Sequence, residues 1–231
     1  VEVDLCLGDP DRFEILSWED RSLRTLLFVA DDPVGVIRQR NQLTGLGALA
    51  PAWVFGPWLD AVRGSANVRD LALKARESHA PVTAIWTEDW KGAVENATGY
   101  HLKGEMTLDT DLYPDGVELA GELEDLGIKW LGYFSTFIAE KSTLWDEAVN
   151  AGVLIQTQDN EPYTFFGATF ETVSMVDLST ANGRDWLASF MDGALELGFD
   201  GWMADYAEWL PVDAQLASGE DALFTHNRYP E

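Results

Sequence analysis

The sequence predicts an α/β protein whose parallel sheet forms a β/α barrel. Helical stretches alternate with short apolar runs along most of the chain, and glycine follows several of the helices. Alternation of helices with buried strands indicates a parallel sheet. Polar residues stand where several strands should end, which is where a β/α barrel builds its site. A doubly wound sheet shares the alternation, so the position of the polar residues has to decide between the two folds.

The repeating unit starts near residue 66 and consists of an amphipathic helix, a stop and a short apolar run. In the first unit the helix "NVRDLALKARESHA" precedes the run "PVTAIWTED", and in the second "GVELAGELEDLG" precedes "IKWLGYFS". In the third, "LWDEAVNAG" precedes "VLIQTQ", and in the fourth, "ANGRDWLASFMDGALELG" precedes "FDGWMAD". Three glycines, Gly127, Gly152 and Gly198, stand where a helix-ending glycine belongs. The spacing predicts an apolar face on the first helix made of Val68, Leu71, Leu73 and Ala75.

The strand ends favour the barrel over the doubly wound sheet. No glycine-rich phosphate loop follows the first strand candidate, "PAWVFGPW", which argues against a dinucleotide-binding fold. Polar residues instead follow three later strands: Glu88 and Asp89 after "TAIW", Ser135 and Thr136 after "WLGYF", and Asp205 after "GWMA". Because the carboxyl ends of barrel strands share one mouth, we expect these side chains to converge there.

The length predicts only part of a barrel. A complete β/α barrel takes roughly 250 residues, and only about 180 follow the first strand candidate near Ala52. We therefore expect residues 46–231 to be the N-terminal half of a barrel, and the chain to be a fragment. Residues 1–45 are expected to be the end of a preceding β-rich, sandwich-like domain and a connecting helix.

Charge and composition limit the partners. The formal net charge of −25 argues against nucleic acid and anionic membranes, which bind basic surfaces, and favours neutral ligands. The acidity fits either an ordinary acidic surface or adaptation to high salt. No apolar run reaches the roughly 20 residues of a membrane span, and the first residues lack signal-peptide features, which favours the cytoplasm. Cys6 is the only cysteine, and the scatter of His79, His101 and His226 argues against a zinc site. The oligomeric state stays open.

Four ordered segments resemble glycoside hydrolase family 31, the retaining α-glycosidases with a (β/α)8 TIM barrel. They are "LTGLGALAPAWVFGPW", "PVTAIWTEDWKG", "VDLSTANGRDWL" and "GFDGWMADYAEWLPVDA", and together they extend over nearly the whole chain. The sequences of these segments are most similar to those of the sulfoquinovosidase-like branch of the family. The resemblance implies hydrolysis of a terminal α-linked sugar with retention through a covalent glycosyl-aspartate intermediate. It implies a carbohydrate as the partner and no cofactor.

The resemblance makes Asp205, in "MADYAE", the catalytic nucleophile. A retaining glycosidase needs one ionised carboxylate to form a glycosyl ester and a second carboxyl group about 5 to 5.5 Å away as acid/base. The family's acid/base lies on a later barrel segment, beyond Glu231. Trp202, Tyr206 and Trp209 would supply an aromatic wall for the sugar ring. From the pattern alone, a helix N-cap is the alternative role for Asp205.

Other site residues follow from the same motifs. Family members place a residue that binds sugar hydroxyls at the end of the second strand, where Glu88 is the first candidate and Asp89 the second. One of these two could instead only cap the loop beside Trp90. Trp86 is close enough in sequence to Glu88 to line the pocket. Glu208 matches the family's glutamate in "MADYAE", where it would orient neighbours, contact the sugar or serve the structure alone.

The branch's sulfonate-binding Arg and Trp are absent. An ungapped match of "GYHLKGEMTLDTDLYPD" places His101 and Gly104 at those two positions. A neutral α-hexoside or α-xyloside is therefore the expected substrate. His101 or Lys103 could still meet an anionic group, although a lone histidine is more often a packing residue. The alternatives in function are a non-catalytic carbohydrate-binding barrel and an α-transglycosylase.

Overall fold

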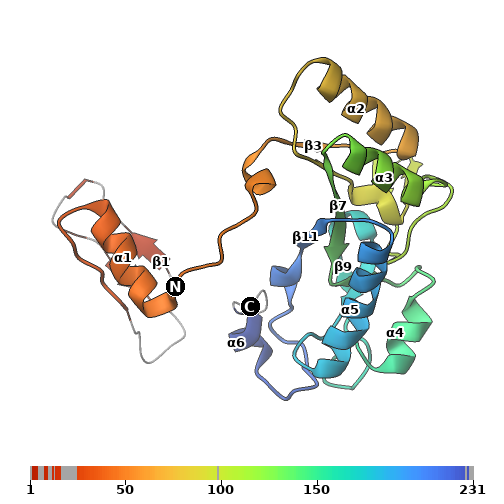
Figure 1. Ribbon diagram of the computed structural model, residues 1–231. Helices are drawn as coiled ribbons and strands as arrows, with labels where there is room; N and C mark the ends of the chain where they lie inside the picture. Colours follow the sequence, from red (N-terminus) through yellow and green to blue (C-terminus); the bar gives the residue numbers. More distant parts are fainter. Residues whose placement is uncertain are drawn as a thin grey trace. The chain divides into compact units, whose positions relative to one another are not determined.

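The computed structural model describes residues 2–4, 8–9, 12, 14–16, 25–97, 99–226 and 228. The chain separates into two compact units, Val1–Ala50 and Pro51–Glu231. In the first unit, β1 (Glu2–Asp4) pairs antiparallel with β2 (Glu14–Leu16), and α1 (Pro33–Thr44) follows (Figure 1). Asp32 caps α1 by accepting a 2.7 Å hydrogen bond from the Gly35 amide. That these residues end a β-rich domain stays a prediction, and many of them lie outside the described part.

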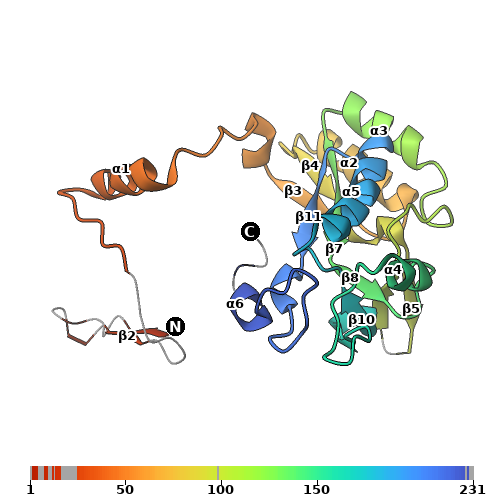
Figure 2. The ribbon, with the colours of Figure 1, turned by 90° about the horizontal axis from the view of Figure 1, so that it is seen from below.

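The second unit is built on a four-stranded parallel sheet in the order β11-β7-β4-β3. The strands are β3 (Trp58–Asp60), β4 (Ala84–Trp86), β7 (Lys129–Ser135) and β11 (Gly201–Asp205) (Figure 2). They follow one another across the sheet in chain order, as barrel strands do, whereas a doubly wound sheet reverses its order at a switch point. The predicted α/β fold with a parallel sheet is confirmed.

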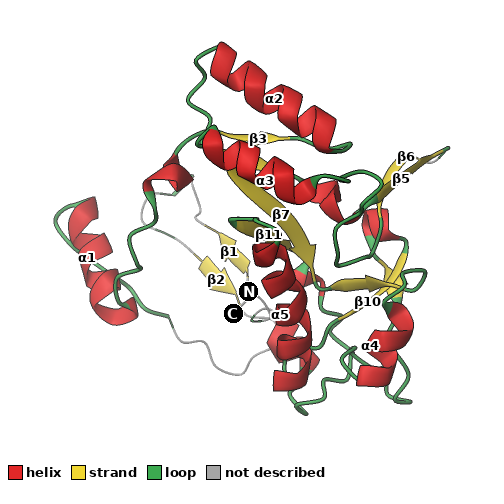
Figure 3. Ribbon diagram, turned by 45° about the vertical axis from the view of Figure 1, so that its right-hand side comes forward, coloured by secondary structure: helices red, strands yellow, loops and turns green. Residues whose placement is uncertain are grey.

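Three helices connect these strands, namely α2 (Ser65–Glu77), α3 (Gly116–Asp125) and α5 (Ala181–Glu196) (Figure 3). The three glycines predicted to end helices have positive φ, of 68° at Gly127 after α3, 101° at Gly198 after α5, and 62° at Gly152 after a further helix, Trp145–Ala151. The predicted face of α2 is partly wrong. Val68 and Ala75 are buried but Leu73 is 46 % exposed, because the buried positions recur every three or four residues through Ala72.

The third helix–strand pair of the sequence prediction is wrong. "VLIQTQ", residues 153–158, adds no strand to the parallel sheet and forms only isolated bridges, such as Leu154 with Val176. Its apolar residues are buried, so the run has the composition of a buried strand without its pairing. The helix before it, α4 (Trp145–Ala151), belongs to an insertion between β7 and α5. This insertion has an antiparallel sheet of β8 (Phe137–Ala139), β10 (Thr172–Met175) and β9 (Phe165–Phe166), with a short helix, η3 (Ala168–Phe170).

The first strand starts later than predicted. "PAWVFGPW" forms a short helix, η1 (Ala52–Phe55), and β3 begins only at Trp58. Pro51 suits the start of a helix, and Gly56 allows close approach, since a Cβ there would lie 2.2 Å from Thr83. The shift moves the end of the first strand from Trp58 to Asp60.

The remaining elements come after β4 and after β11 in the chain. They are η2 (Glu88–Lys91), the hairpin β5 (Ala93–Asn96) and β6 (Gly99–Leu102), η4 (Ala207–Trp209) and α6 (Ala222–His226). The core centres on stacked aromatic rings, with Trp130 3.9 Å and Trp90 4.9 Å from Phe199 between ring centroids. Among the described residues, no helix has the length and apolar character to cross a membrane.

Candidate active site

One face of the parallel sheet gathers the candidate residues. Successive side chains of a strand point to opposite faces, and the register pairs Asp60 with Trp86, Trp86 with Leu131, and Asp205 with Ser135. One face therefore carries Asp60, Trp86, Leu131, Tyr133, Ser135, Met203 and Asp205. The opposite face carries Ile85 and Trp130, which are buried in the core.

Asp205 is the last residue of β11 and is half-buried. Its Oδ2 accepts a 2.9 Å hydrogen bond from the Tyr133 hydroxyl, and its Oδ1 accepts one of 3.1 Å from the Tyr206 amide. Burial, followed by the charge of Asp205, raises the pKa of Tyr133, so Tyr133 stays a donor. Both carboxylate oxygens are thus oriented by donors while the group keeps an exposed surface.

Tyr206 follows directly and has a left-handed backbone, with φ of 63°. A bulky residue rarely adopts this conformation, and such strain is concentrated at functional sites. The ring stacks 5.0 Å from Phe137 and meets Trp209 edge-on at 5.1 Å. The turn therefore places an aromatic ring beside the carboxylate. Glu208, the next candidate, is exposed on η4.

Trp202 does not share this position. It lies three residues before Asp205 in β11, so its side chain is on the opposite face of the sheet. There it packs edge-on against Phe134, 5.5 Å between ring centroids. The structure thus separates Trp202 from the predicted aromatic wall, and the odd spacing within the strand was the sequence signal for this.

Glu88 begins η2, directly after β4, and is half-buried. Burial raises its pKa, and so do the negative charges of Asp60, Asp89 and Asp205. Glu88 therefore belongs to the same electrostatic cluster as Asp205. Trp86, on the site face, lies 6.1 Å from the Tyr133 ring, and its buried indole N–H has no hydrogen-bond partner among the described residues.

Asp60 was missed by the sequence analysis. It ends β3 on the site face, and burial and the charge of Asp89 raise its pKa. The strand-end rule that found Glu88 and Asp205 also applies to Asp60. It failed because the first strand had been placed at "PAWVFGPW", which ends before this residue.

Asp89 stands next to Glu88 but is 0 % exposed. Its Oδ2 accepts a 2.7 Å hydrogen bond from the Arg63 amide, and its Oδ1 accepts one from the Tyr113 hydroxyl. The Tyr113 oxygen in turn accepts from the Gly64 amide at 3.3 Å. Asp89 therefore fastens the loop after β3 to the segment before α3 and has no surface left for a ligand.

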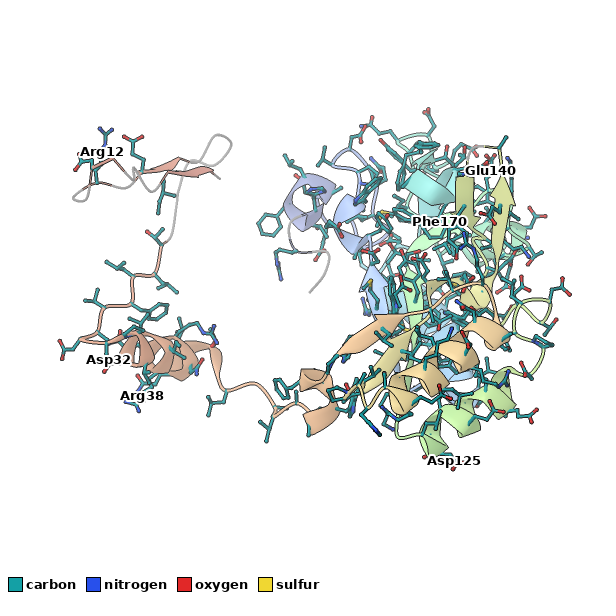
Figure 4. The ribbon with its side chains drawn as sticks, turned by 90° about the horizontal axis from the view of Figure 1, so that it is seen from above. Arg12, Asp32, Arg38, Asp125, Glu140 and Phe170 are labelled. Carbon is teal, nitrogen blue, oxygen red and sulfur yellow. The ribbon has the colours of Figure 1, made fainter. Side chains whose placement is uncertain are left out.

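His101 lies on β6 and lines a separate cleft of about 290 Å³ with Lys103, Gly104, Ala139, Lys141 and Phe170. Phe170, labelled in Figure 4, also packs 6.4 Å from Tyr133 and 6.2 Å from Tyr206, so the cleft adjoins the Asp205 site. Lys103 forms an ion pair with Asp109 at 2.7 Å.

Gly104 is packed tightly against the end of β8. A Cβ at Gly104 would lie 2.4 Å from the Ala139 Cβ and 2.9 Å from its backbone nitrogen. A larger side chain at Gly104, such as the tryptophan of the sulfoquinovosidase-like branch, therefore meets a steric obstacle. A tryptophan would require β6 or β8 to move.

Lys91 is the second residue that the sequence analysis missed. It is 3 % exposed, and its Nζ lies 3.5 Å from the Met106 Sδ and 5.1 Å and 5.7 Å from the ring centroids of Phe134 and Tyr133. Burial lowers the pKa of Lys91 to about 7, against the opposing effect of Glu105. A lysine so close to a strand end is normally read as a solvated residue, so the sequence carried no signal for it.

The described residues contain no group of three or more His, Cys, Asp or Glu side chains placed to hold a metal ion. The site is instead a set of carboxylates and aromatic rings at the carboxyl ends of parallel strands. Such a set can bind hydroxyl groups, pack against the apolar face of a ring and supply a carboxylate nucleophile.

The chain is similar in sequence to glycoside hydrolases. It is 30 % identical to a sulfoquinovosidase of Agrobacterium fabrum over 205 residues, which are 88 % of this chain and 31 % of the relative. It is 28 % identical to a sulfoquinovosidase of Escherichia coli, over 96 % of this chain and 33 % of the relative. It is 27 % identical to the α-xylosidase XylQ of Lactiplantibacillus pentosus, over 99 % of this chain and 30 % of the relative. The chain thus spans about a third of each of these relatives.

Solved structures agree in fold. A family 31 sulfoquinovosidase from E. rectale, in complex with the aza-sugar inhibitor IFGSQ, matches with a TM-score of 0.78 at 27 % identity, over 87 % of this chain and 30 % of that one. A family 31 dextranase of Flavobacterium johnsoniae matches with a TM-score of 0.74 at 19 % identity, over 87 % and 25 %. The model of the glycosyl hydrolases family 31 TIM-barrel domain matches residues 47–230. The chain therefore belongs to glycosyl hydrolase family 31, and residues 47–230 are part of its TIM-barrel domain.

Proposed function

We propose that the chain is the N-terminal half of the catalytic barrel of a retaining α-glycosidase, with Asp205 as its nucleophile. The family membership supports the glycosidase chemistry. The sheet supports the half barrel, because its four strands run in chain order from β3 at one edge to β11 at the other. The chain also spans about a third of its relatives, which leaves room in a longer protein for the remaining strands.

The position of Asp205 carries the proposal. Its carboxylate is held by Tyr133 and by the Tyr206 amide, and it keeps a partly exposed surface at the end of β11. An Asp205 oxygen would attack the anomeric carbon and form a glycosyl ester as the leaving oxygen departs with a proton from the acid/base. Water, deprotonated by that same acid/base, would then release the sugar with retained configuration. The acid/base would come from a barrel segment outside this chain, and no cofactor takes part.

The neighbouring residues divide into two groups. Glu88 would bind sugar hydroxyls, since its half-buried carboxylate lies in the same electrostatic cluster as Asp205. The partly exposed Trp86 ring, on the Asp205 side of the sheet, would line the pocket. The Tyr206 ring would pack against the sugar. We assign Asp89 a structural role, because both of its oxygens are occupied in the interior.

For the substrate, we propose a terminal α-linked sugar without a sulfonate, either an α-hexoside or an α-xyloside. The similarity to an α-xylosidase at 27 % identity supports this choice, whereas the similarity to two sulfoquinovosidases supports the sulfonated alternative. The cleft lined by His101 and Gly104 favours a sugar without a sulfonate. Where the branch has its sulfonate-binding tryptophan, Gly104 is packed against Ala139 and leaves no room for that ring.

The test is mechanism-based labelling of the full-length protein that contains this chain. We would incubate it with 5-fluoro-α-glucosyl fluoride and, separately, with 5-fluoro-α-xylosyl fluoride, and then measure intact mass and map the modified peptide. We expect one adduct on the peptide that contains Asp205. The Asp205→Ala variant should form none, and the matched control Asp213→Ala, whose carboxylate bonds the Tyr163 hydroxyl at 2.7 Å, should form it normally.

Two other outcomes would redirect the proposal. Sugar binding without any adduct would indicate a non-catalytic carbohydrate-binding barrel. An adduct that is released to a sugar acceptor faster than to water would indicate an α-transglycosylase, which shares the nucleophile and differs in the acceptor site. An adduct on another carboxylate would remove Asp205 from its proposed role.

A further inference from the structure

Lys91 occupies an unusual environment beside the candidate site. It lies on η2, three residues after Glu88, and is almost fully buried. Its ammonium forms no ion pair with the residues that the structure describes, and its polar contact is the Met106 sulfur at 3.5 Å. Burying a charge without a partner is costly, so a lysine here needs a compensating interaction.

Aromatic rings supply that compensation. The Nζ atom lies 5.1 Å from the Phe134 centroid, 5.7 Å from that of Tyr133 and 5.9 Å from that of Trp90. These distances are within the range of cation–π attraction, which strengthens when the cation is desolvated. Of the three rings, Tyr133 is the one bonded to the candidate nucleophile, because its hydroxyl donates to Asp205 at 2.9 Å, whereas the Trp90 indole N–H donates to the Tyr133 backbone oxygen at 3.1 Å.

A nearby cation changes the phenol as a donor. It draws electron density from the ring, which makes the hydroxyl more acidic and its hydrogen bond to a carboxylate stronger. A stronger bond to the charged form of a carboxyl group favours that form. Lys91 is thereby connected to Asp205 through one ring and one hydrogen bond.

We propose that Lys91 is a positioning residue that acts on Asp205 through Tyr133, strengthening the hydrogen bond that orients the nucleophile. This proposal rests on the proposed role of Asp205. The titratable groups that face Lys91 are Glu105 after β6 and Tyr133 on β7, and its own element also carries Glu88 and Asp89. Because the pKa of Lys91 is lowered to about 7, the ammonium form prevails below neutral pH and is lost above it.

The test measures the rate of Asp205 labelling by the 5-fluoro-glycosyl fluoride that labels it, from pH 4 to pH 9, in the full-length protein. Fluoride leaves without a proton donor, so this rate reports the nucleophile rather than the acid/base. For Lys91→Met we expect the acidic midpoint of the labelling rate to move up by about half a pH unit, so that the rate falls about threefold at pH values well below that midpoint. Lys74→Met, which removes an exposed lysine on α2, is the matched control and should retain the wild-type profile.

A double-mutant cycle tests the route through Tyr133. Tyr133→Phe should shift the acidic midpoint in the same direction, and Lys91→Met should add no further shift in the Tyr133→Phe protein. Wild-type labelling should also decline as pH rises past 7, and this decline should disappear in Tyr133→Phe. That last comparison needs no substitution at Lys91, so it still decides the proposal if Lys91→Met and the second variant, Lys91→Leu, fail to fold.

The possible failures are distinct. A wild-type profile in Lys91→Met, or a Lys91→Met shift that persists at full size in Tyr133→Phe, would overturn the role of Lys91 and leave Asp205 as nucleophile. The absence of an Asp205 adduct in the wild-type protein at any pH would instead overturn the proposed function itself.

Discussion

Two aspartates in this molecule accept the same kinds of hydrogen bond and differ in exposure. Asp205 receives a tyrosine hydroxyl from Tyr133 and the Tyr206 amide. Asp89 receives a tyrosine hydroxyl from Tyr113 and the Arg63 amide. Both stand at or just after the carboxyl end of a parallel strand of one sheet, yet Asp89 is 0 % exposed and Asp205 is half-buried.

The comparison shows that hydrogen-bond partners alone do not separate a carboxylate closed off in the interior from one that stays open to a ligand. At Asp89 the partners come from two loops, so the carboxylate joins segments that would otherwise separate. At Asp205 they come from the neighbouring strand and the next residue, so the carboxylate adds little to the connection between segments. The first arrangement stabilises the fold, and the second orients a group that remains open to a ligand.

The largest expected effect is on activity at Asp205. Asp205→Ala in the full-length protein should lower kcat/KM by a factor on the order of 10⁴ or more, because it removes the carboxylate proposed to form the covalent intermediate. Its melting temperature should stay within a few degrees of the wild type. Steady-state kinetics with an aryl α-glycoside and thermal unfolding measure the two quantities. Unchanged turnover would contradict the nucleophile assignment.

The reverse pattern is expected at Asp89. Asp89→Ala should lower the free energy of unfolding by about 3 kcal/mol, because it leaves the Arg63 amide and the Tyr113 hydroxyl buried without an acceptor. Chemical denaturation of the full-length protein measures the loss. A variant as stable as the wild type but unable to bind sugar would show that Asp89, and not Glu88, meets the substrate.

The two tyrosines provide a matched pair with a smaller effect. Tyr113→Phe should cost about 1 to 2 kcal/mol of stability, since Asp89 loses a donor that water cannot replace in the interior. Tyr133→Phe should cost less, because water can reach half-buried Asp205, but it should lower kcat/KM about tenfold. Chemical denaturation gives the free energy of unfolding of each variant, and steady-state kinetics gives the kcat/KM of each. Equal stability losses would remove the distinction between the two aspartates.

The sequence predicted the frame of the fold and the end of β11 well. Three of the four helix–strand pairs and the glycine stops follow from apolar periodicity and from the φ that glycine tolerates, both of which are local properties. "VLIQTQ" failed because a buried extended segment and a buried strand share one composition, and only long-range pairing separates them. The prediction of the first strand failed for a related reason, since the apolar composition of "PAWVFGPW" suits a short helix as well as a strand.

The candidate site was predictable where it depends on strand ends and not where it depends on packing. Asp205 and Glu88 follow from strand position. The position of Trp202 outside the site also follows from the sequence, because residues 202 and 205 of one strand point to opposite faces of the sheet. Two features depend on residues distant in sequence, so no local pattern could predict them. They are the hydrogen bond from Tyr113 that occupies buried Asp89 and the burial of Lys91 among aromatic rings.

Glu88 gives the smallest expected effect and tests whether the carboxylates at the sheet edge repel one another. Its pKa is raised by burial and by the charges of Asp60, Asp89 and Asp205, so the folded protein binds its proton more readily than the unfolded chain does. Stability should therefore fall as pH rises from the unfolded pKa of 4.5 through the raised folded value, and the full cost should be present above it. Glu88→Gln removes this cost.

We expect Glu88→Gln to match the wild type in stability near pH 4 and to exceed it at pH 7, by less than about 1 kcal/mol because solvent screens a half-buried group. Melting temperatures at the two pH values measure the difference. Glu196→Gln, at an exposed position of α5, is the matched control and should show a smaller change between pH 4 and pH 7. If Glu88→Gln were no more stable than the wild type at pH 7, the Glu88 charge would be fully solvated. Glu88 would then not share the electrostatic environment of Asp205.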